Sequence, residues 1–481
     1  MPHRRLLFLM IGLSAMALSG HLAMALAPSD ATLGLLNAAV PVAIAIGFGV
    51  LAFWIVATEA VMIWTPLVMF LANMAVFRGI GPLVYVFGSD ATQAKIWAGA
   101  WGLSPGELFS THVLNLTGAA AVVAGICLVS LGREVGAARG RAAVRAASIP
   151  VAAMSLFLLG AIVRYGLVLP VSFGTGDTYL PGIVRNLRFL VDLGFALIAY
   201  LAVKRGGRWT VVFWLFFPPH LFTLVLEFKK SALVLGLMLP VLGAFLANGR
   251  LRGLIAAAAL IGLLAVAMHP VVKSARAQML EQSGEAFGAT FSQRVDILSG
   301  LLSAPTMSEP SAASAKPEQV GWLRLSYAAQ QAIAMRSYQG GDVRDTVSTA
   351  WQVFVPRLIW PEKPAFSSLS ESFYRAITGA GGALAGVTVF ADAYWNAGWG
   401  GVLVVGLLAG AFFGFSSRFA IDVVRRRDFV LLPVVFLAMD MALREMNGWI
   451  LTGLFGPIPF LLAYLVVVQA GRRLSWRGRF A

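Results

Sequence analysis

Several arginine and lysine residues of this 481-residue chain lie inside or directly beside long apolar runs, where cations are costly. Guanidinium forks match the oxygens of a phosphate, and a low-dielectric surround strengthens that attraction. We therefore predict a cationic site for a phosphate or diphosphate. The residues nominated by their charge and position are Arg164, Arg185, Arg188, Lys229, Lys230, Arg294 and Arg444.

A structural interpretation of these charges stays open. Arg185, Arg188 and Asp192 are spaced i, i+3 and i+7, so they would share one helix face. In this interpretation Asp192 pairs with Arg188, Asp440 pairs with Arg444, and the lysines reach toward lipid headgroups. Several such charges on one face favour the functional interpretation, because placing each charge among membrane helices has a free-energy cost that packing alone would not justify.

Familiar catalytic motifs are absent from the sequence. It has no HExxH, GxSxG, Walker loop or DxD, so we predict no metal cofactor and disfavour a nucleotide-activated donor. The Gly-rich stretch 379–386 lacks the preceding strand of a nucleotide-binding loop. The five histidines are scattered, and the two that fall near or within apolar runs are interpreted as helix-packing residues: His112 and His220.

The composition indicates the elements that must position these charges. The chain is 59% hydrophobic and 12% charged, with a mean hydropathy of +0.80, whereas soluble proteins have roughly 25% charged residues. This predicts an all-α integral membrane protein in contact with a lipid bilayer. The net charge of +15 is then explained largely by membrane topology, so no nucleic-acid partner is expected. A lone cysteine, Cys127, excludes an internal disulfide.

Apolar runs near the roughly 20 residues needed to cross a bilayer predict about twelve spans. They cover approximately 6–27, 33–57, 60–87, 108–131, 149–170, 183–203, 209–227, 231–247, 253–269, 398–418, 429–446 and 449–469. Alternate connections are rich in arginine and lysine, which predicts that both termini are cytoplasmic. The first run is interpreted as a span, with a signal peptide as the alternative.

These spans divide the chain into three segments. Residues 1–269 form a nine-helix membrane region, 270–397 one large periplasmic segment, and 398–481 a three-helix region with a basic cytoplasmic tail. Within the periplasmic segment, 291–302 and 322–338 have helical apolar spacing. A connector rich in Ala, Ser and Pro is expected at 303–318.

Three stretches resemble motifs of the bacterial oligosaccharide repeat-unit polymerases, the Wzy-type O-antigen and exopolysaccharide polymerases. In order they are LEFKKSALVLGLMLPVLGAFL (226–246), VPRLIWPEKPAFS (355–367) and FADAYWNAGWGGVLVVGLLAGAFFG (390–414). The region 64–88 is a looser match. The chain has Asp392 where the family usually has Glu, and Ala397 where it usually has Phe.

The resemblance implies a metal-independent glycosyltransferase of the bacterial cell inner membrane. It would join undecaprenyl-diphosphate-linked oligosaccharides at the periplasmic face, and a chain-length regulator protein would be a further partner. The matched positions nominate Asp392 and Arg357 as catalytic residues, and Lys230 and Lys363 as ligands of the diphosphate or glycan. A general base would be Asp392 or Glu371, unless no single side chain takes that role.

Two other functions stay open. An O-antigen ligase would use the same class of donor, and a catalytic histidine in the large loop would favour it, although 270–397 contains none. A flippase or exporter of lipid-linked oligosaccharide would use buried charges for translocation and would not need so large an outer segment. The sequence leaves open whether the product would be O-antigen, capsule or exopolysaccharide.

Overall fold

The computed structural model has helices and no strands in the residues that it describes. These are 3–89, 102–131, 148–174, 184, 187–283, 289–303, 322–355, 359–360, 362–363, 367–379 and 385–477. The chain divides into two compact units. Unit 1 comprises Met1–Ala142, Trp322–Val424 and Val434–Ala481, and unit 2 comprises Ala143–Gly321 and Arg425–Pro433.

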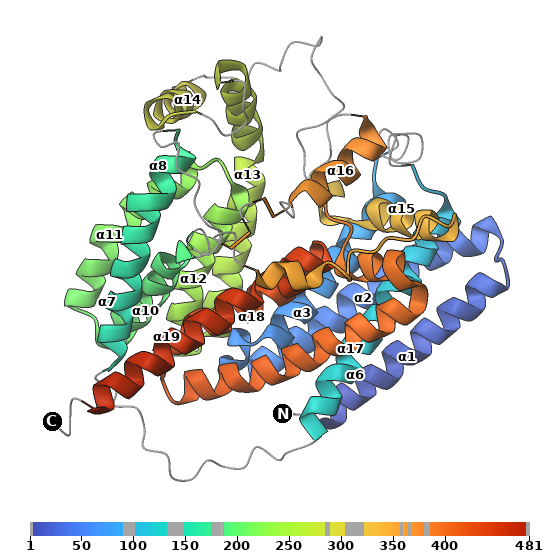
Figure 1. The fold of residues 1–481 in the computed structure, drawn as a ribbon, viewed down its shortest axis with the longest axis horizontal. Helices are drawn as coiled ribbons and strands as arrows, with labels where there is room; N and C mark the ends of the chain where they lie inside the picture. The colour runs from blue at the N-terminus through green and yellow to red at the C-terminus, as the bar shows by residue number, and fades with distance from the viewer. Residues whose placement is uncertain are drawn as a thin grey trace. The chain divides into compact units, whose positions relative to one another are not determined.

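Unit 1 contains most of the helices from the two ends of the chain (Figure 1). They are α1 (His3–Ala25), α2 (Asp30–Thr58), η1 (Ala60–Trp64), α3 (Pro66–Asn73), η2 (Met74–Ile80), η3 (Gly81–Leu83), α4 (Val84–Phe87), α6 (Pro105–Leu131), η6 (Leu323–Leu325), α15 (Ala328–Gln339), η7 (Ala350–Phe354), α16 (Ser367–Thr378), α17 (Val389–Arg425), α18 (Leu432–Leu443), η9 (Glu445–Asn447), η10 (Leu451–Phe455) and α19 (Ile458–Arg477), with the last residue of α17 and the first two of α18 counted in unit 2.

Unit 2 contains the middle of the chain. Its elements are α7 (Ser148–Ala161), η4 (Ile162–Val168), α8 (Leu169–Ser172), α10 (Leu190–Arg205), α11 (Arg208–Leu226), α12 (Lys230–Asn248), α13 (Leu251–Ser283), α14 (Phe291–Ser303) and η8 (Phe429–Leu431). The segments η2, η4 and η10 are π-helices.

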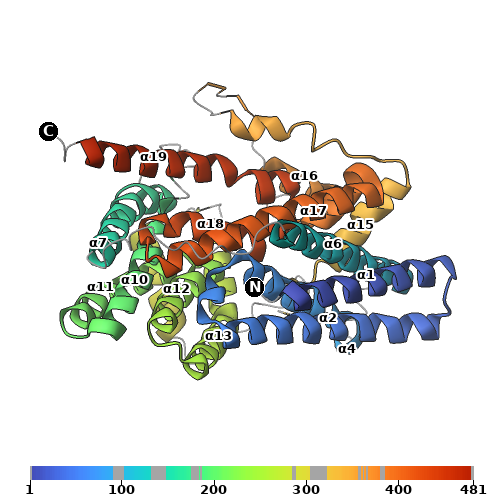
Figure 2. The same ribbon diagram turned by 90° about the horizontal axis from the view of Figure 1, so that it is seen from below.

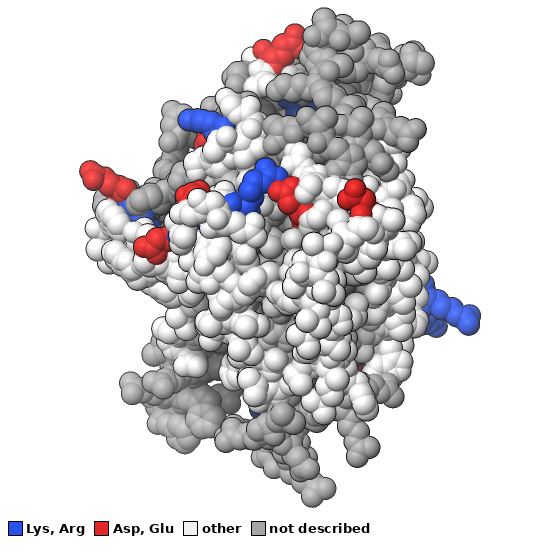
Figure 3. Space-filling view, turned by 90° about the vertical axis from the view of Figure 1, so that its right-hand side faces the viewer, with Lys and Arg blue, Asp and Glu red and all other residues white. Residues whose placement is uncertain are grey.

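Ten of the described helices are long and apolar enough to cross a membrane. Large apolar side chains on these helices face outward, for example Phe8, Leu35 and Val266. One face of the protein has a broad band with few charged side chains (Figure 3). These features are those of a multi-pass α-helical membrane protein, as the composition predicts.

The predicted count of twelve includes two runs that are not among these ten helices. The run 183–203 overlaps α10, which has 16 residues and ends at Arg205. The run 429–446 contains α18, which has 12 residues and is flanked by the short 3-10 turns η8 and η9. Both are shorter than the roughly 20 residues of a full crossing. The twelve-span topology and the periplasmic placement of 270–397 stay predictions.

The predicted segment boundary at 269/270 lies inside a continuous helix. Helix α13 has 33 residues, about 50 Å at 1.5 Å per residue. It includes Pro270 and continues for thirteen residues beyond it. Apolarity falls after His269, but Ala275, Ala277 and Met279 are good helix formers and the helix does not end there. The sequence-predicted helix at 291–302 is confirmed as α14, and 322–338 as η6 and α15. The connector at 303–318 lies almost wholly outside the described residues.

Helix α10 is the central element of unit 2. It packs against α7, α11 and α12, which surround it in Figures 1 and 2. Two glycines permit this close approach, since a Cβ on Gly160 of α7 would lie 2.0 Å from the Val191 nitrogen, and one on Gly243 of α12 would lie 1.9 Å from the Ala196 oxygen. Every residue from Leu190 to Leu201 is therefore buried.

In unit 1, helix α17 begins with a short turn of helix and then bends. Ala397 and Gly398 are not helical, and Gly398 has a φ of 58°, which an L side chain rarely adopts. The bend falls where the sequence predicts the start of a membrane span. The residues before it, including Asp392, are packed in the interior of unit 1.

Candidate functional site

The cations of unit 2 gather around the link between α11 and α12. This link contains Glu227, Phe228 and Lys229, and Phe228 has a left-handed φ of 47°. Arg276 of α13 stabilises that conformation, because its Nε and Nη2 donate to the Phe228 carbonyl at 3.1 and 2.9 Å. The turn is thus fixed by an arginine that sequence analysis did not nominate.

Arg294 of α14 also contacts the end of α11 at this link. It is buried, its guanidinium lies over the Phe173 ring, and its nitrogens donate to three backbone carbonyls. These belong to Ala289, Leu226 and Ser172, at 2.8, 3.1 and 3.1 Å. Carbonyls at a helix C-terminus lack helical partners, so Arg294 ties together the ends of α8 and α11. We assign it a positioning role.

Lys229 and Lys230 stand at the N-terminus of α12, where the helix dipole adds positive potential. Burial lowers the pKa of Lys229; Glu227 raises it, and Arg188, Arg294 and Arg276 lower it further. The Nζ of Lys230 lies 2.6 Å from Nδ1 of His269. Arg188, which was expected on the helix of Asp192, lies in a turn just before α10. Several cations from separate segments therefore converge on this link.

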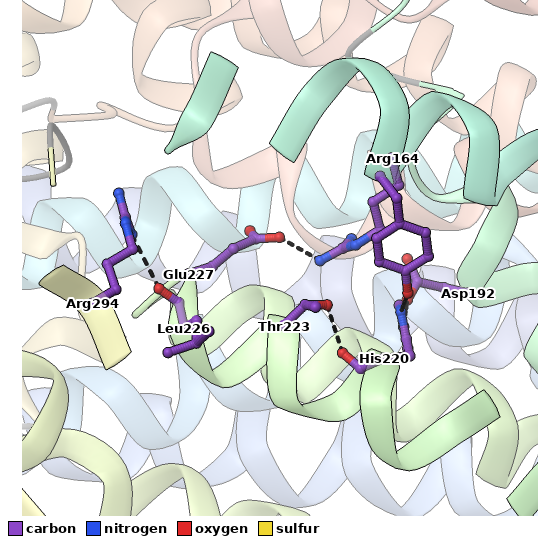
Figure 4. A network of polar contacts seen from close by, with 8 residues as sticks. Arg164, Asp192, His220, Thr223, Leu226, Glu227 and Arg294 are labelled. Atoms are coloured by element: carbon purple, nitrogen blue, oxygen red, sulfur yellow. Dashed lines mark hydrogen bonds and ion pairs between the residues drawn. The ribbon is translucent and has the colours of Figure 1, made fainter. Parts of the chain in front are cut away.

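Arg164 also reaches the link. It is buried on η4 and forms an ion pair with Glu227, so the two side chains point toward one another in Figure 4. A buried ion pair is strongly destabilised when one partner is removed. Arg164 and Glu227 thus hold η4 against the end of α11.

A second chain of polar contacts begins at the next residue. The hydroxyl of Tyr165 lies 2.7 Å from Nδ1 of His220. Nε2 of His220 lies 2.8 Å from Oδ1 of Asp192 (Figure 4). A carboxylate accepts hydrogen bonds, so Asp192 selects the tautomer in which Nε2 carries the proton and Nδ1 accepts from Tyr165. Among the described residues, Asp192 makes no ion pair with Arg188, in contrast to the structural interpretation of the sequence.

Asp392, a predicted catalytic residue, belongs to unit 1. Its side chain is fully buried, and both carboxylate oxygens accept hydrogen bonds from the protein. The Ile450 amide donates at 2.9 Å, Asn396 Nδ2 at 3.1 Å and Thr346 Oγ1 at 3.3 Å. These donors come from three separate segments. The carboxylate therefore joins the 342–349 loop to α17 and η10.

Arg344 lies beside this carboxylate, between two tryptophans. Its guanidinium is 4.5 Å from the ring centroids of both Trp395 and Trp449. Burial lowers the pKa of Arg344, and Asp392 and Asp342 raise it. Two aromatic faces on one guanidinium form a cage that stabilises the cation by cation–π attraction. Nearby, Trp351 is exposed and stacks on Trp360, with ring planes 12° apart.

The remaining nominated residues are in unit 1 or cannot be placed. Arg444 forms an ion pair with Asp440, as the structural interpretation expects. Lys363 is buried and donates to the Val355 and Val353 carbonyls at 3.0 and 3.4 Å, closing the end of η7. Arg185 and Arg357 lie outside the described residues. Among the described residues, the nominated cations therefore belong to both units.

Sequence analysis overlooked Tyr165, Glu227 and Arg276 and gave His220 only a packing role. A signal existed for Tyr165, which follows Arg164 in an apolar run, but its partner is 55 positions away. His112 occupies the buried packing position expected of it, yet neither ring nitrogen has a hydrogen-bond partner among the described residues. The described residues also hold no group of His, Cys, Asp and Glu arranged for a metal ion.

The chain was compared with family models, with curated proteins and with solved structures, and none of them matches it.

Proposed function

We propose that this protein is a metal-independent glycosyltransferase that polymerises undecaprenyl-diphosphate-linked oligosaccharides at the periplasmic face of the bacterial inner membrane. The proposal places the diphosphate at the link between α11 and α12. One observation carries it: cations from several segments of unit 2 converge on the N-terminus of a membrane-spanning helix.

The chemistry of that link suits an anionic leaving group. Lys229, Lys230 and Arg188 supply positive charge beside the α12 N-terminus, and helix N-termini bind phosphates through amides and dipole together. Charge that develops on a departing diphosphate is then stabilised electrostatically. Arg276 and Arg294 donate hydrogen bonds to backbone carbonyls of the link and would thereby hold the lysines in position.

In this proposal Asp392 positions protein rather than substrate. Its carboxylate is enclosed by protein donors, so it holds the 342–349 loop and its aromatic neighbours. The exposed Trp351 supports a glycan-binding surface in that segment, because an aromatic face can stack on a sugar ring.

The test uses the full-length protein in liposomes with an undecaprenyl-diphosphate-linked repeat unit, and product length is read by gel electrophoresis. Wild type is expected to form long chains. Lys229→Ala and Arg188→Ala are each expected to lower the elongation rate about 10-fold to 100-fold, the cost of one charge-assisted hydrogen bond. Arg324→Ala removes an exposed cation of η6 and is the matched control, expected to elongate as wild type does. Products no longer than the starting repeat in wild type would refute the polymerase.

One observation favours a glycan ligase as a second candidate. His269 lies beside Lys230 in the same cationic site. Helix α13 continues without interruption from His269 into the predicted outer segment. Adding a lipid A core acceptor to the same liposomes separates the two functions. Transfer to that core without self-elongation of the repeat unit would identify a ligase.

A further inference from the structure

The contacts of Tyr165, His220 and Asp192 run from the interior of unit 2 to its surface. Asp192 is 4% exposed and His220 1%, whereas Tyr165 is 37% exposed. Both heavy-atom distances, 2.7 and 2.8 Å, lie in the range for direct proton transfer. An ionisable pair inside a membrane-spanning helix bundle is costly, which favours a functional origin.

Tyr165, the most exposed of the three residues, lies next to the cationic site. Tyr165 follows Arg164, whose guanidinium pairs with Glu227 at the α11–α12 link. His220 lies one turn before Thr223 on α11, the same helix that ends at this link. A molecule whose diphosphate is bound there would have its sugar close to the tyrosine hydroxyl.

We propose that Asp192, His220 and Tyr165 form a proton relay that acts as the general base for the acceptor hydroxyl. The inference rests on the proposed glycosyl transfer and supplies the base that spacing along the sequence leaves undecided. Tyr165 is the catalytic residue that touches the substrate. His220 accepts the proton, and Asp192 orients the imidazole.

The acceptor oxygen forms a bond to the anomeric carbon, and its proton passes to the Tyr165 oxygen while the Tyr165 proton moves to Nδ1 of His220. The bond between the anomeric carbon and the diphosphate oxygen breaks, and its electron pair leaves with the diphosphate. Asp192 stabilises the resulting imidazolium. The proton then returns through Tyr165 to water.

Three features separate a relay from simple satisfaction of buried polar groups. The carboxylate fixes the tautomer with the basic nitrogen facing the hydroxyl, and the hydroxyl belongs to an exposed side chain. In addition, Tyr165 and Arg164 lie on a π-helical segment, an irregularity that occurs frequently at functional sites. A packing histidine would need none of these.

The experiment compares Tyr165→Phe with wild type in the liposome assay. Phenylalanine retains the ring and removes only the oxygen, so the fold is expected to persist. The expected result is a 10²-fold to 10⁴-fold lower kcat for elongation, the usual range for general base catalysis, with an unchanged KM for the lipid-linked donor. Tyr200→Phe of α10 removes a buried hydroxyl from the same unit and is the control, expected to keep full activity.

A second measurement does not depend on turnover. With ¹⁵N-histidine, the His220 signals are assigned by their loss in His220→Gln, and wild type is expected to show the tautomer protonated at Nε2. The opposite tautomer, or Tyr165→Phe elongating at the wild-type rate, would overturn the relay alone. Wild-type protein that forms no glycosidic bond would overturn the proposed function and the relay together. Proton transport that accompanies export of unpolymerised repeat units would also overturn both. It would identify an exporter.

Discussion

Two buried aspartates, one in each unit, have opposite surroundings. Asp392 of unit 1 receives hydrogen bonds from a backbone amide, an amide side chain and a hydroxyl, and a caged arginine lies close by. Asp192 of unit 2 contacts one imidazole, which in turn contacts an exposed phenol. The donors of Asp392 hold segments together, whereas the donor to Asp192 that the described residues supply is an imidazole N–H.

The difference shows that burial alone does not identify a catalytic carboxylate. A carboxylate whose two oxygens both accept hydrogen bonds from fixed donors stabilises the fold. One that faces a titratable ring can move charge. The following variants test this distinction between the two units.

Asp392→Ala is expected to have the largest effect on stability. It leaves several buried donors and Arg344 without their carboxylate, which costs about 3–5 kcal/mol of unfolding free energy. Cys127 is the one cysteine of the chain and is buried in α6 of unit 1. A thiol-reactive dye therefore reports thermal unfolding of that unit in detergent. An unchanged midpoint would show that Asp392 does not hold unit 1 together.

Asp192→Asn is expected to leave the fold intact and to stop the chemistry. The asparagine amide can donate to His220 and favour the wrong tautomer, so elongation is expected to fall about 10³-fold to 10⁴-fold. Circular dichroism and size-exclusion behaviour are expected to match wild type. A variant that unfolds as Asp392→Ala does would erase the contrast between the two aspartates.

Arg344→Gln should show a smaller loss of stability in unit 1. The change removes a cation that lies between Trp395 and Trp449, and two cation–π contacts of this kind contribute about 1–2 kcal/mol. The dye midpoint measures the loss, and Arg324→Gln at an exposed position of η6 is the control. Equal midpoints for both variants would mean that the cage adds nothing.

The smallest effect is expected in the pH dependence of ligand binding at Lys229. Burial lowers its pKa, so the ammonium loses its charge at a lower pH than an ordinary lysine does. Affinity for undecaprenyl diphosphate should therefore decline earlier on the alkaline side, by less than about tenfold. Lys229→Arg keeps its charge and should bind with a flatter profile between pH 8 and roughly pH 10. Identical pH profiles for wild type and Lys229→Arg would show that Lys229 does not bind the ligand.

The sequence predicts the fold class well because membrane helices are encoded locally. A run of about 20 apolar residues is sufficient to indicate a span, and the bend at Gly398 coincides with a predicted span boundary. The end of α13 was missed because helix propensity continues after hydropathy falls. Hydropathy marks the edge of the membrane, not the end of a helix.

The sequence predicts individual cations of the site from their charge and position, but it predicts contacts only between neighbours in sequence. Lys229 and Lys230 are adjacent and were nominated together, and their charge alone indicates an anion. The relay joins residues 28 and 55 positions apart, and no local spacing encodes such a pairing. Asp392 was found by motif, but only its surroundings reveal that its oxygens are occupied.

The π-helical segment η4 also has a consequence for insertions and deletions. A π-helical turn holds one more residue than an α-helical turn, so η4 carries a surplus residue within an otherwise regular membrane helix. Loss of one residue between Ile162 and Val168 could be absorbed as ordinary α-helix without shortening the span. The helices on either side would keep nearly the same relative orientation, because a π-helical turn holds its extra residue within one turn, whereas the side chains inside η4 would point in new directions. A relative of this protein with that deletion could keep its membrane architecture while Arg164 and Tyr165 no longer meet their partners.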